Sequence, residues 1–402
     1  MGIGGTLMKN ESRKLRKLLV VFLAAILLTV ALPLTDLTQL SSAKGKDEIT
    51  LEDYDLEITS VAFTDHRYYA FTGQKTPVYI TISNVNETDV PNVMAEVYEV
   101  NDIGEEIFLK TLHYGKIKAG EEKEKHIHWT PTLPGRNWIK VVAGVKEEHG
   151  PEMIPLIERT VSCNVLSSSK ETMYIDNDWI IDEPEIFENL NIIVDGDVYV
   201  YAPSGLKDCS IIAGDLIVEA PFEIDTASNW DMAATFDGEF TVQVNAPEGH
   251  LIVQGKIWNN PSDYHYDFVV YNELTVDGQY GGGIIENVNG ISTDPSVPGG
   301  IQCINTDNVV FKNGAVVRNS NSHGIYLDNS DAVIEDTLIY GNAGVGLVSN
   351  DSAPYVGASL LLDNYYGGIH VRNYSEISPF VRPEFTPGDK RGYYIWREDD
   401  TY

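Results

Sequence analysis

The chain has few basic residues for its length, and this scarcity narrows the range of possible partners. It contains 28 lysines and arginines against 60 aspartates and glutamates, and its formal net charge is −32. We therefore expect no nucleic-acid partner, because phosphate binding requires positive charge. The excess of acidic side chains favours solubility, and it suits a salty medium or a surface that holds divalent cations.

Cysteine is also scarce, with Cys163, Cys209 and Cys303 the only three in 402 residues. They are odd in number and far apart, so they form no metal-binding spacing and leave at least one thiol unpaired in a monomer. Cys303 occupies an apolar strand position, where we expect it to be buried as a small hydrophobic side chain.

Long apolar segments are limited to one, Leu18–Leu32, which follows a cluster of four basic residues and precedes Ser41–Ala43. This order predicts a secretory signal peptide over residues 1–43, cleaved near Ala43. The segment is short for a membrane span and Pro33 follows it; an uncleaved anchor is the alternative, and would be the chain's one contact with a membrane. We expect the remaining chain to be extracellular, at the cell surface.

Helical periodicity is lacking as well, and the C-terminal part instead repeats every 22 to 24 residues. Each repeat begins at a glycine: Gly300, Gly324, Gly346 and Gly368. Five residues later comes a small polar residue: Asn305, Asn329, Asp351 and Asn373. Nine residues after the glycine comes an apolar one: Val309, Val333, Tyr355 and Ile377. A second apolar column, Val316, Leu338 and Leu360, is followed four residues on by Ser320, Asn342 and Asn364.

Short apolar runs separated by polar corners at a constant period predict stacked coils of β-strands. We therefore expect an all-β chain whose residues 172–386 form a right-handed parallel β-helix, with coils about 4.8 Å apart. The corner residues Asn305, Asn329, Asp351, Asn373, Asn342 and Asn364 are expected to bond to their counterparts in the next coil. Residues 387–402 are expected to be a tail or a cap.

The repeats over residues 299–386 resemble those of pectin-lyase-like proteins. The resemblance implies stacked outer faces that suit extended polymers such as polysaccharides. That class contains both enzymes and non-catalytic surface proteins, so the fold alone does not assign an activity.

Short strands with turn signals every 8–12 residues predict a β-sandwich before the β-helix. Three of its segments, Asp55–Ile58, Ile117–Gly120 and Trp129–Pro131 followed by Gly135, resemble the immunoglobulin-like cell-adhesion-related (CARDB-type) domain. The resemblance implies a spacer or adhesion module. The expected organisation is a linker over 44–54, the sandwich over 55–166 and a second linker over 167–171.

One constellation resembles that of polygalacturonases: Asn305-Thr306-Asp307, then His323-Gly324, then Arg372. The resemblance implies catalytic roles for Asp307, His323 and Arg372, since carboxylates act there as general acid and base. The chain departs from the pattern, because less than one coil separates Asp307 from His323 and no Asp pair lies between them. The alternative is that Asn305 and Asp307 are corner residues.

Oxygen donors at short spacing make Asp328 and Asp331 candidate calcium ligands, although turn hydrogen bonding explains the same residues. Tyrosines that face outward would be able to stack on sugar rings. The candidates are Tyr264, Tyr266, Tyr326, Tyr340, Tyr365 and Tyr366.

These observations favour an exported, non-catalytic surface protein that binds a polysaccharide or another cell-envelope component. A polysaccharide lyase or glycoside hydrolase that acts in the β-helix groove is the first alternative. A purely structural envelope stalk is the second. An outward aromatic ladder would favour glycan binding, a carboxylate pair facing one groove would favour an enzyme, and uniform polar faces would favour a stalk.

Overall fold

The structure is a computed structural model, and it describes residues 54–63, 69–101, 104–146, 153–232, 240–258, 266–373, 375, 384–385 and 395–397. Tyr54–Tyr402 belong to one compact unit. The predicted signal peptide, residues 1–43, lies outside the described residues. Within the described part, no helix combines the length and apolar character that crossing a membrane requires.

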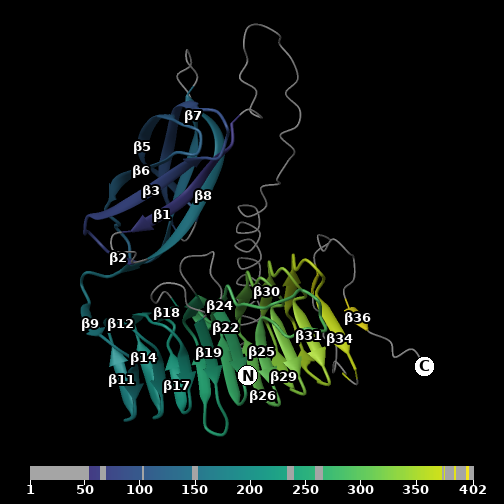
Figure 1. The fold of residues 1–402 in the computed structure, drawn as a ribbon. Coiled ribbons are helices and arrows are strands. Elements are labelled where there is room, and N and C mark those ends of the chain that lie inside the picture. Colours follow the sequence, from purple (N-terminus) through teal and green to yellow (C-terminus); the bar gives the residue numbers. More distant parts are fainter. Residues whose placement is uncertain are drawn as a thin grey trace, which may run out of the picture. The chain divides into compact units, whose positions relative to one another are not determined.

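The first strands form a β-sandwich of two sheets (Figure 1). One sheet has the order β1 (Leu56–Phe63), β3 (Thr76–Asn84), β6 (Glu122–Trp129). The other has the order β2 (Tyr69–Phe71), β8 (Met153–Leu166), β7 (Gly135–Lys146), β4 (Val90–Val100), β5 (Glu106–Ile117). All pairs are antiparallel except β2 with β8.

Alternating apolar residues give the sandwich its own hydrophobic core. Val78, Ile80 and Ile82 of β3 are fully buried, as the period of two in a strand requires. Trp129 packs against Phe63 with ring centroids 6.0 Å apart. Because each such side chain contributes about 1.5–3 kcal/mol when it is buried, this cluster stabilises the sandwich separately from the strands that follow.

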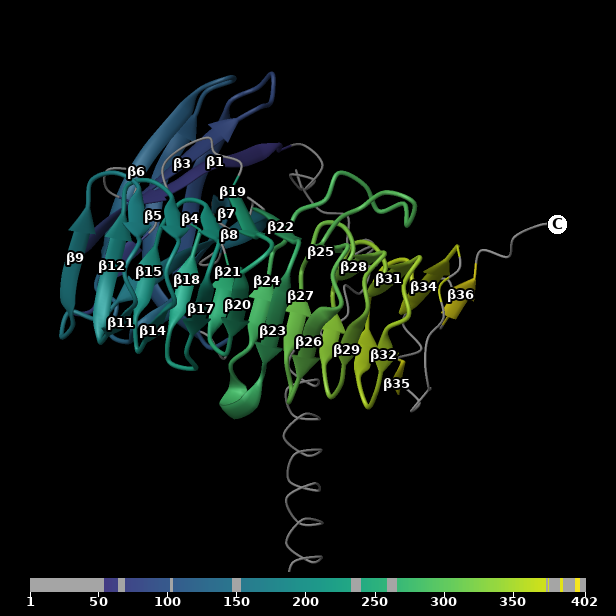
Figure 2. The same ribbon diagram turned by 90° about the horizontal axis from the view of Figure 1, so that it is seen from below.

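From Glu171 onward the chain winds through three parallel sheets (Figure 2). Sheet I consists of β9 (Glu171–Ile175), β12 (Leu190–Val194), β15 (Ser210–Ile212), β18 (Asn229–Asp231), β21 (Lys256–Trp258), β24 (Ile284–Glu286), β27 (Val316–Arg318), β30 (Leu338–Tyr340), β33 (Leu360–Leu362) and β35 (Glu384–Phe385). Sheet II consists of β10 (Trp179–Ile181), β13 (Val198–Val200), β16 (Leu216–Val218), β19 (Phe240–Val244), β22 (Tyr266–Val270), β25 (Ile301–Ile304), β28 (Ile325–Asp328), β31 (Leu347–Asn350), β34 (Ile369–Arg372) and β36 (Ile395–Arg397). Sheet III consists of β11 (Glu185–Glu188), β14 (Ser204–Lys207), β17 (Pro221–Ile224), β20 (His250–Val253), β23 (Glu273–Asp277), β26 (Asn308–Lys312), β29 (Ala332–Ile334) and β32 (Tyr355–Val356). A short 3-10 helix, η3 (Gln279–Gly281), leads into β24.

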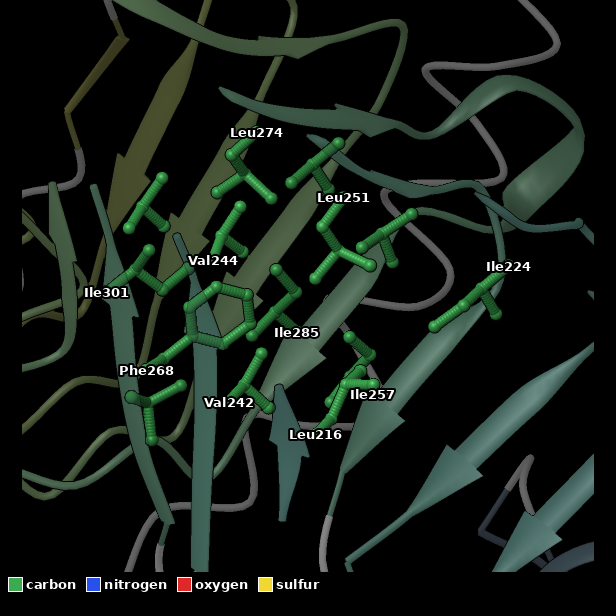
Figure 3. Packing of buried hydrophobic residues seen from close by; sticks show 14 of the residues in the cluster. Leu216, Ile224, Val242, Val244, Leu251, Ile257, Phe268, Leu274, Ile285 and Ile301 are labelled. Carbon is green, nitrogen blue, oxygen red and sulfur yellow. The ribbon is translucent and has the colours of Figure 1, made fainter. Parts of the chain in front are cut away.

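Each strand pairs with the strand one coil away, so side chains of one kind stack in columns. Inward-facing residues from all three sheets meet in a continuous core, as Figure 3 shows for Ile257, Leu251 and Phe268. The prediction of an all-β chain with a sandwich followed by a parallel β-solenoid is confirmed. β36 pairs with β34, which places a solenoid strand within residues 387–402.

The sequence alignment of one column was wrong by one residue. Val309 was aligned with Val333, but it pairs with Ala332, and Val333 is 40% exposed. The coil that starts at Gly300 has one additional residue at each of two corners. The steps between paired residues are therefore 24 in sheet II, 23 in sheet III and 22 in sheet I (Ile301 to Ile325, Val309 to Ala332, Val316 to Leu338).

Four of the predicted corner residues turn the chain through the left-handed region. Asn305, Asn329, Asp351 and Asn373 have φ values of 53°, 47°, 48° and 50°. Short polar side chains tolerate this conformation better than other non-glycine residues do. The Asn329 amide also donates to the side-chain oxygen of Asn305, 2.8 Å away, which links one coil to the next.

The other two predicted corner residues are buried and bond along the solenoid axis. Asn342 accepts from the Ser320 amide at 2.9 Å, and Asn364 accepts from the side chain of Asn342 at 2.8 Å. Crowding by the next coil, to which these amides contribute together with backbone carbonyls, explains two of the repeated glycines. A Cβ at Gly324 would lie 2.9 Å from the side-chain nitrogen of Asn342, and one at Gly346 would lie 2.8 Å from that of Asn364.

Replacing Asn364 with alanine is expected to lower the free energy of unfolding by about 2–4 kcal/mol. The change removes the acceptor for both the backbone and the side-chain amide of Asn342, which are buried and would lose their bonds. Urea denaturation measures the effect. Asn329→Gly is the control, because it keeps the left-handed corner and removes one exposed bond; an equal loss for both variants would contradict the prediction.

A cationic pocket as the candidate functional site

One outward-facing column of sheet I is unusually rich in charged and aromatic side chains. Asp231, Trp258, Glu286, Arg318 and Tyr340 occupy the third position of successive strands, two residues after the first. Trp258 is 3% exposed, Glu286 3% and Asp231 0%, although all three face away from the solenoid core. They are buried because side chains of the sandwich strand β7 lie over this column.

Glu286 is the centre of the charge network in this column. Its carboxylate forms an ion pair with Arg136 of β7 and accepts from Nε of Arg318 at 2.6 Å. Nη1 of Arg318 donates to the hydroxyl of Tyr340, 2.7 Å away. One carboxylate thus contacts two guanidinium groups.

Arg136 is held in place by aromatic rings as well as by charge. Its guanidinium carbon lies 4.3 Å from the ring centroid of Trp258 and 5.1 Å from that of Trp138. A planar guanidinium stacks on aromatic faces and still presents its N–H groups in the ring plane. The side chain of Arg136 is only 12% exposed, so its orientation is fixed before any ligand arrives.

These residues surround a pocket of about 250 Å³. It is lined by Gly135, Arg136, Trp138, Asn229, Lys256, Trp258, Ile284, Glu286 and Arg318. Three basic side chains therefore face one acidic one, in a protein whose net charge is −32. A positive pocket on an acidic protein favours an anionic ligand.

Asp231 adds no full negative charge beside this network. Burial raises the pKa of its carboxyl well above the ordinary value, although Arg136 and the amide of Asn164 oppose the shift. In the part of the chain that the structure describes, neither carboxyl oxygen has a hydrogen-bond partner. Asn164 instead donates to Asn229, 3.3 Å away. The raised pKa favours the neutral form of the Asp231 carboxyl.

The three residues predicted to be catalytic lie in two kinds of surroundings, an exposed corner and a buried contact with a loop. Asp307 is exposed, and its side chain accepts from the Asp331 amide at 3.2 Å. His323 is fully buried: Nδ1 accepts from the Val345 amide at 3.1 Å and Nε2 lies 3.3 Å from the Asp294 carbonyl. Burial lowers the pKa of His323, which favours the neutral ring.

Arg372 contacts the same loop as His323, because its Nη1 donates to the Pro295 carbonyl at 3.1 Å. The hydrogen bonds of His323 and Arg372 thus hold the segment 292–297 against sheet II, whereas Asp307 bonds to the corner of the neighbouring coil. A shared catalytic role for the three side chains remains a sequence-based prediction.

The two candidate calcium ligands also hydrogen-bond along the coils. Asp328 accepts from the side chain of Asn350 at 2.7 Å, and Asp331 accepts from the Ala353 amide at 2.6 Å. Within the described residues, no group of three or more His, Cys, Asp or Glu side chains is arranged to hold a metal ion. Calcium binding by Asp328 and Asp331 stays a prediction.

The candidate tyrosines do not form one outward ladder. Tyr266 and Tyr326 are buried, Tyr340 bonds to Arg318, and Tyr365 is 49% exposed beside Tyr366. Tyr264 lies outside the described residues. The three cysteines are buried and unpaired, as expected for Cys303.

Sequence reasoning missed the pocket, although one signal pointed towards it. The apolar column of Val316, Leu338 and Leu360 was recognised, and the residues two positions later include Arg318 and Tyr340. Those positions share the outward face of sheet I, because strand side chains alternate with a period of two. The repeat gave no indication of Arg136, because this residue of the pocket lining belongs to strand β7 of the sandwich.

No protein-family profile matches the chain, and no curated protein matches it. Among solved structures, the chain is similar to the CARDB domain of the PF1109 protein from Pyrococcus furiosus, crystallised with di-metal ions (17% identity, 31% of this chain and 100% of that chain, TM-score 0.23). It is also similar to the C-terminal domain of wzt (15% identity, 28% and 74%, TM-score 0.24). A third likeness is to a β-glucosidase from Listeria innocua in complex with glucose (18% identity, 28% and 16%, TM-score 0.20). At these identities and TM-scores none of the likenesses bears on what the chain does.

Proposed function

We propose that the chain is an exported cell-surface protein that binds a saccharide of its envelope or surroundings without modifying it. The observation that carries this proposal is the pocket of about 250 Å³ beside Trp138 and Trp258, with Arg136 and Arg318 fixed by Glu286. The proposed location rests on the signal peptide predicted over residues 1–43 and on the acidic composition.

The chemistry of the pocket lining supports a saccharide as the ligand. Sugar hydroxyls need directional donors and acceptors, which Asn229, Lys256 and Arg318 supply in the pocket lining. The C–H faces of a sugar ring need apolar or aromatic surface, which Ile284 and Trp138 supply in the same lining. Small-molecule sites combine such an apolar lining with a few convergent polar groups.

The hydrogen bonding of Asp307 gives less support to an enzyme that acts at this residue. Its carboxylate oxygen accepts a backbone bond from the next coil, as a corner residue would. A general acid or base instead has to reach the bond that is broken. Under the proposed function, Asp307 stabilises a corner, and the saccharide is held elsewhere and released intact.

A panel of polysaccharides and their oligomers tests the proposal with the purified protein. We expect retention on at least one saccharide, no release of shortened products, and unchanged retention by the Asp307→Asn variant. Product release that the same substitution abolishes would replace the proposal with the enzyme. A folded protein that retains no saccharide would favour the structural stalk.

A further inference from the structure

We propose that the pocket holds the end unit of a saccharide that bears one acidic group, bound between Arg318 and Lys256. This inference rests on the proposed function and names its ligand class. It also makes the sandwich a part of the binding site, because Arg136 and Trp138 of β7 complete the pocket lining.

The charges of the lining call for an anion. Glu286 is the one acidic residue in the lining, beside the basic residues Arg136, Lys256 and Arg318. Lys256 is exposed at the first position of β21 and makes no ion pair with another described residue. A ligand with one carboxylate or sulfate group would compensate this excess and form charge-assisted hydrogen bonds.

Arg318 is oriented for this role before the ligand binds. Its Nε is bonded to Glu286 and its Nη1 to Tyr340, and its side chain is 32% exposed at the pocket. Nη2 has no bond to another described residue, so a further donor remains for the ligand. Because the guanidinium is already immobilised, binding loses little side-chain entropy.

The size of the pocket favours one sugar unit over a stretch of polymer. A volume of about 250 Å³ is below the range of roughly 300–1,000 Å³ that is typical of sites for drug-sized ligands. The pocket is bounded by strand β7 on one side and by the solenoid on the other, through Arg136 on Trp258. The geometry thus accommodates the end of a saccharide chain.

Calorimetric titrations with paired ligands test the inference. The probes are two oligosaccharides of equal length, one ending in a glucuronate unit and one in glucose, together with a glucose-6-sulfate-ended analogue, sodium acetate and sodium sulfate. We expect both acid-ended ligands to bind about tenfold or more tightly than the neutral one, since a charged hydrogen bond is lost in the neutral ligand. Added salt should reduce the difference in affinity between the acid-ended and neutral ligands, because it screens the charges.

Lys256→Gln identifies the site, because Lys256 is exposed and its side chain makes no ion pair with another described residue. We expect this variant to weaken the acid-ended ligands by about fivefold or more, and to weaken the neutral ligand less, because a bond from Lys256 to a sugar hydroxyl lacks a charged acceptor. Lys207→Gln is the matched control, since Lys207 is an exposed lysine of sheet III outside the pocket. It should bind all ligands as the unchanged protein does.

The outcomes separate this inference from the proposed function. Equal affinity for acid-ended and neutral ligands would overturn the inference and leave saccharide binding in place. Binding of acetate or sulfate as tight as that of the acid-ended ligands would overturn it as well, because the sugar would then add nothing. Failure of every saccharide to bind to the folded protein would overturn both.

Discussion

Replacing Glu286 with alanine is expected to lower the free energy of unfolding by about 3 kcal/mol or more, the largest effect of a single substitution in the pocket. Glu286 is 3% exposed and forms ion pairs with both Arg136 and Arg318. Its removal leaves a guanidinium that is only 12% exposed without its carboxylate partner. An uncompensated buried charge costs more than the ion pair contributed, because water cannot replace the lost partner.

Urea denaturation followed by tryptophan fluorescence measures this loss, and two further variants separate its causes. The double variant Arg136→Met, Glu286→Leu removes both charges and should recover most of the stability, because apolar residues of similar volume replace a buried pair well. Glu188→Ala removes the carboxylate of an exposed pair with Lys207 and should leave the unfolding midpoint unchanged. If Glu286→Ala changed the free energy of unfolding as little as Glu188→Ala does, the charges around Glu286 would be accessible to solvent and the prediction would be wrong.

Asp231→Asn is expected to make the protein increasingly more stable than the unchanged protein as the pH rises. Burial raises the pKa of Asp231 above its ordinary value of 3.8, so the folded state keeps the proton after the unfolded chain has released it. The contribution of Asp231 is thus fully present below the ordinary pKa and is lost as pH rises towards the raised one. Over that window the loss approaches about 1.4 kcal/mol per pH unit, and asparagine, which does not titrate, avoids it.

Denaturation of both proteins from about pH 4 to about pH 8 tests this prediction through the slope of the difference in unfolding free energy. The difference should be small at the acidic end and should grow with pH. Asp307→Asn, at an exposed corner, controls for the loss of one negative charge. A difference for Asp231→Asn that stays constant over this range would contradict the assignment of a protonated carboxyl beside the pocket.

The regular coils could be predicted because their period is visible in the sequence. From β25 to β34 the glycines and the corner residues recur with few insertions, and bonds such as Asn342 to Asn364 require that repetition. The shift at Val309 shows the limit of this reasoning. An additional residue at a corner changes the register without disturbing the apolar pattern, because a strand offers an apolar neighbour on either side.

The pocket could not be predicted from the same repeat. Glu286 and Arg318 are paired in sheet I but lie 32 residues apart in the sequence, because the chain between them includes the long segment before β25. Arg136 belongs to another domain, and its position over Trp258 depends on how β7 packs in three dimensions. The burial of Asp231 could not be predicted from the sequence either, since an aspartate at an outward strand position normally faces water.

The sequence-based candidates also differ from the pocket in their chemical surroundings. Asp307, His323 and Arg372 were selected by their resemblance to a known motif, and each forms a hydrogen bond with the backbone of a neighbouring coil or loop. Corner and loop residues of a solenoid need such bonds for their own turns. A motif match within a polar repeat therefore indicates a site only when the three-dimensional contacts of its residues support one.

A crystal structure of the protein soaked with the glucuronate-ended oligosaccharide tests the central claim most directly. We predict density for one sugar unit in the pocket, with its carboxylate near Arg318 and Lys256 and its ring beside Trp138. Density for the saccharide along the outer face of sheet II or sheet III, with the pocket empty, would contradict the account.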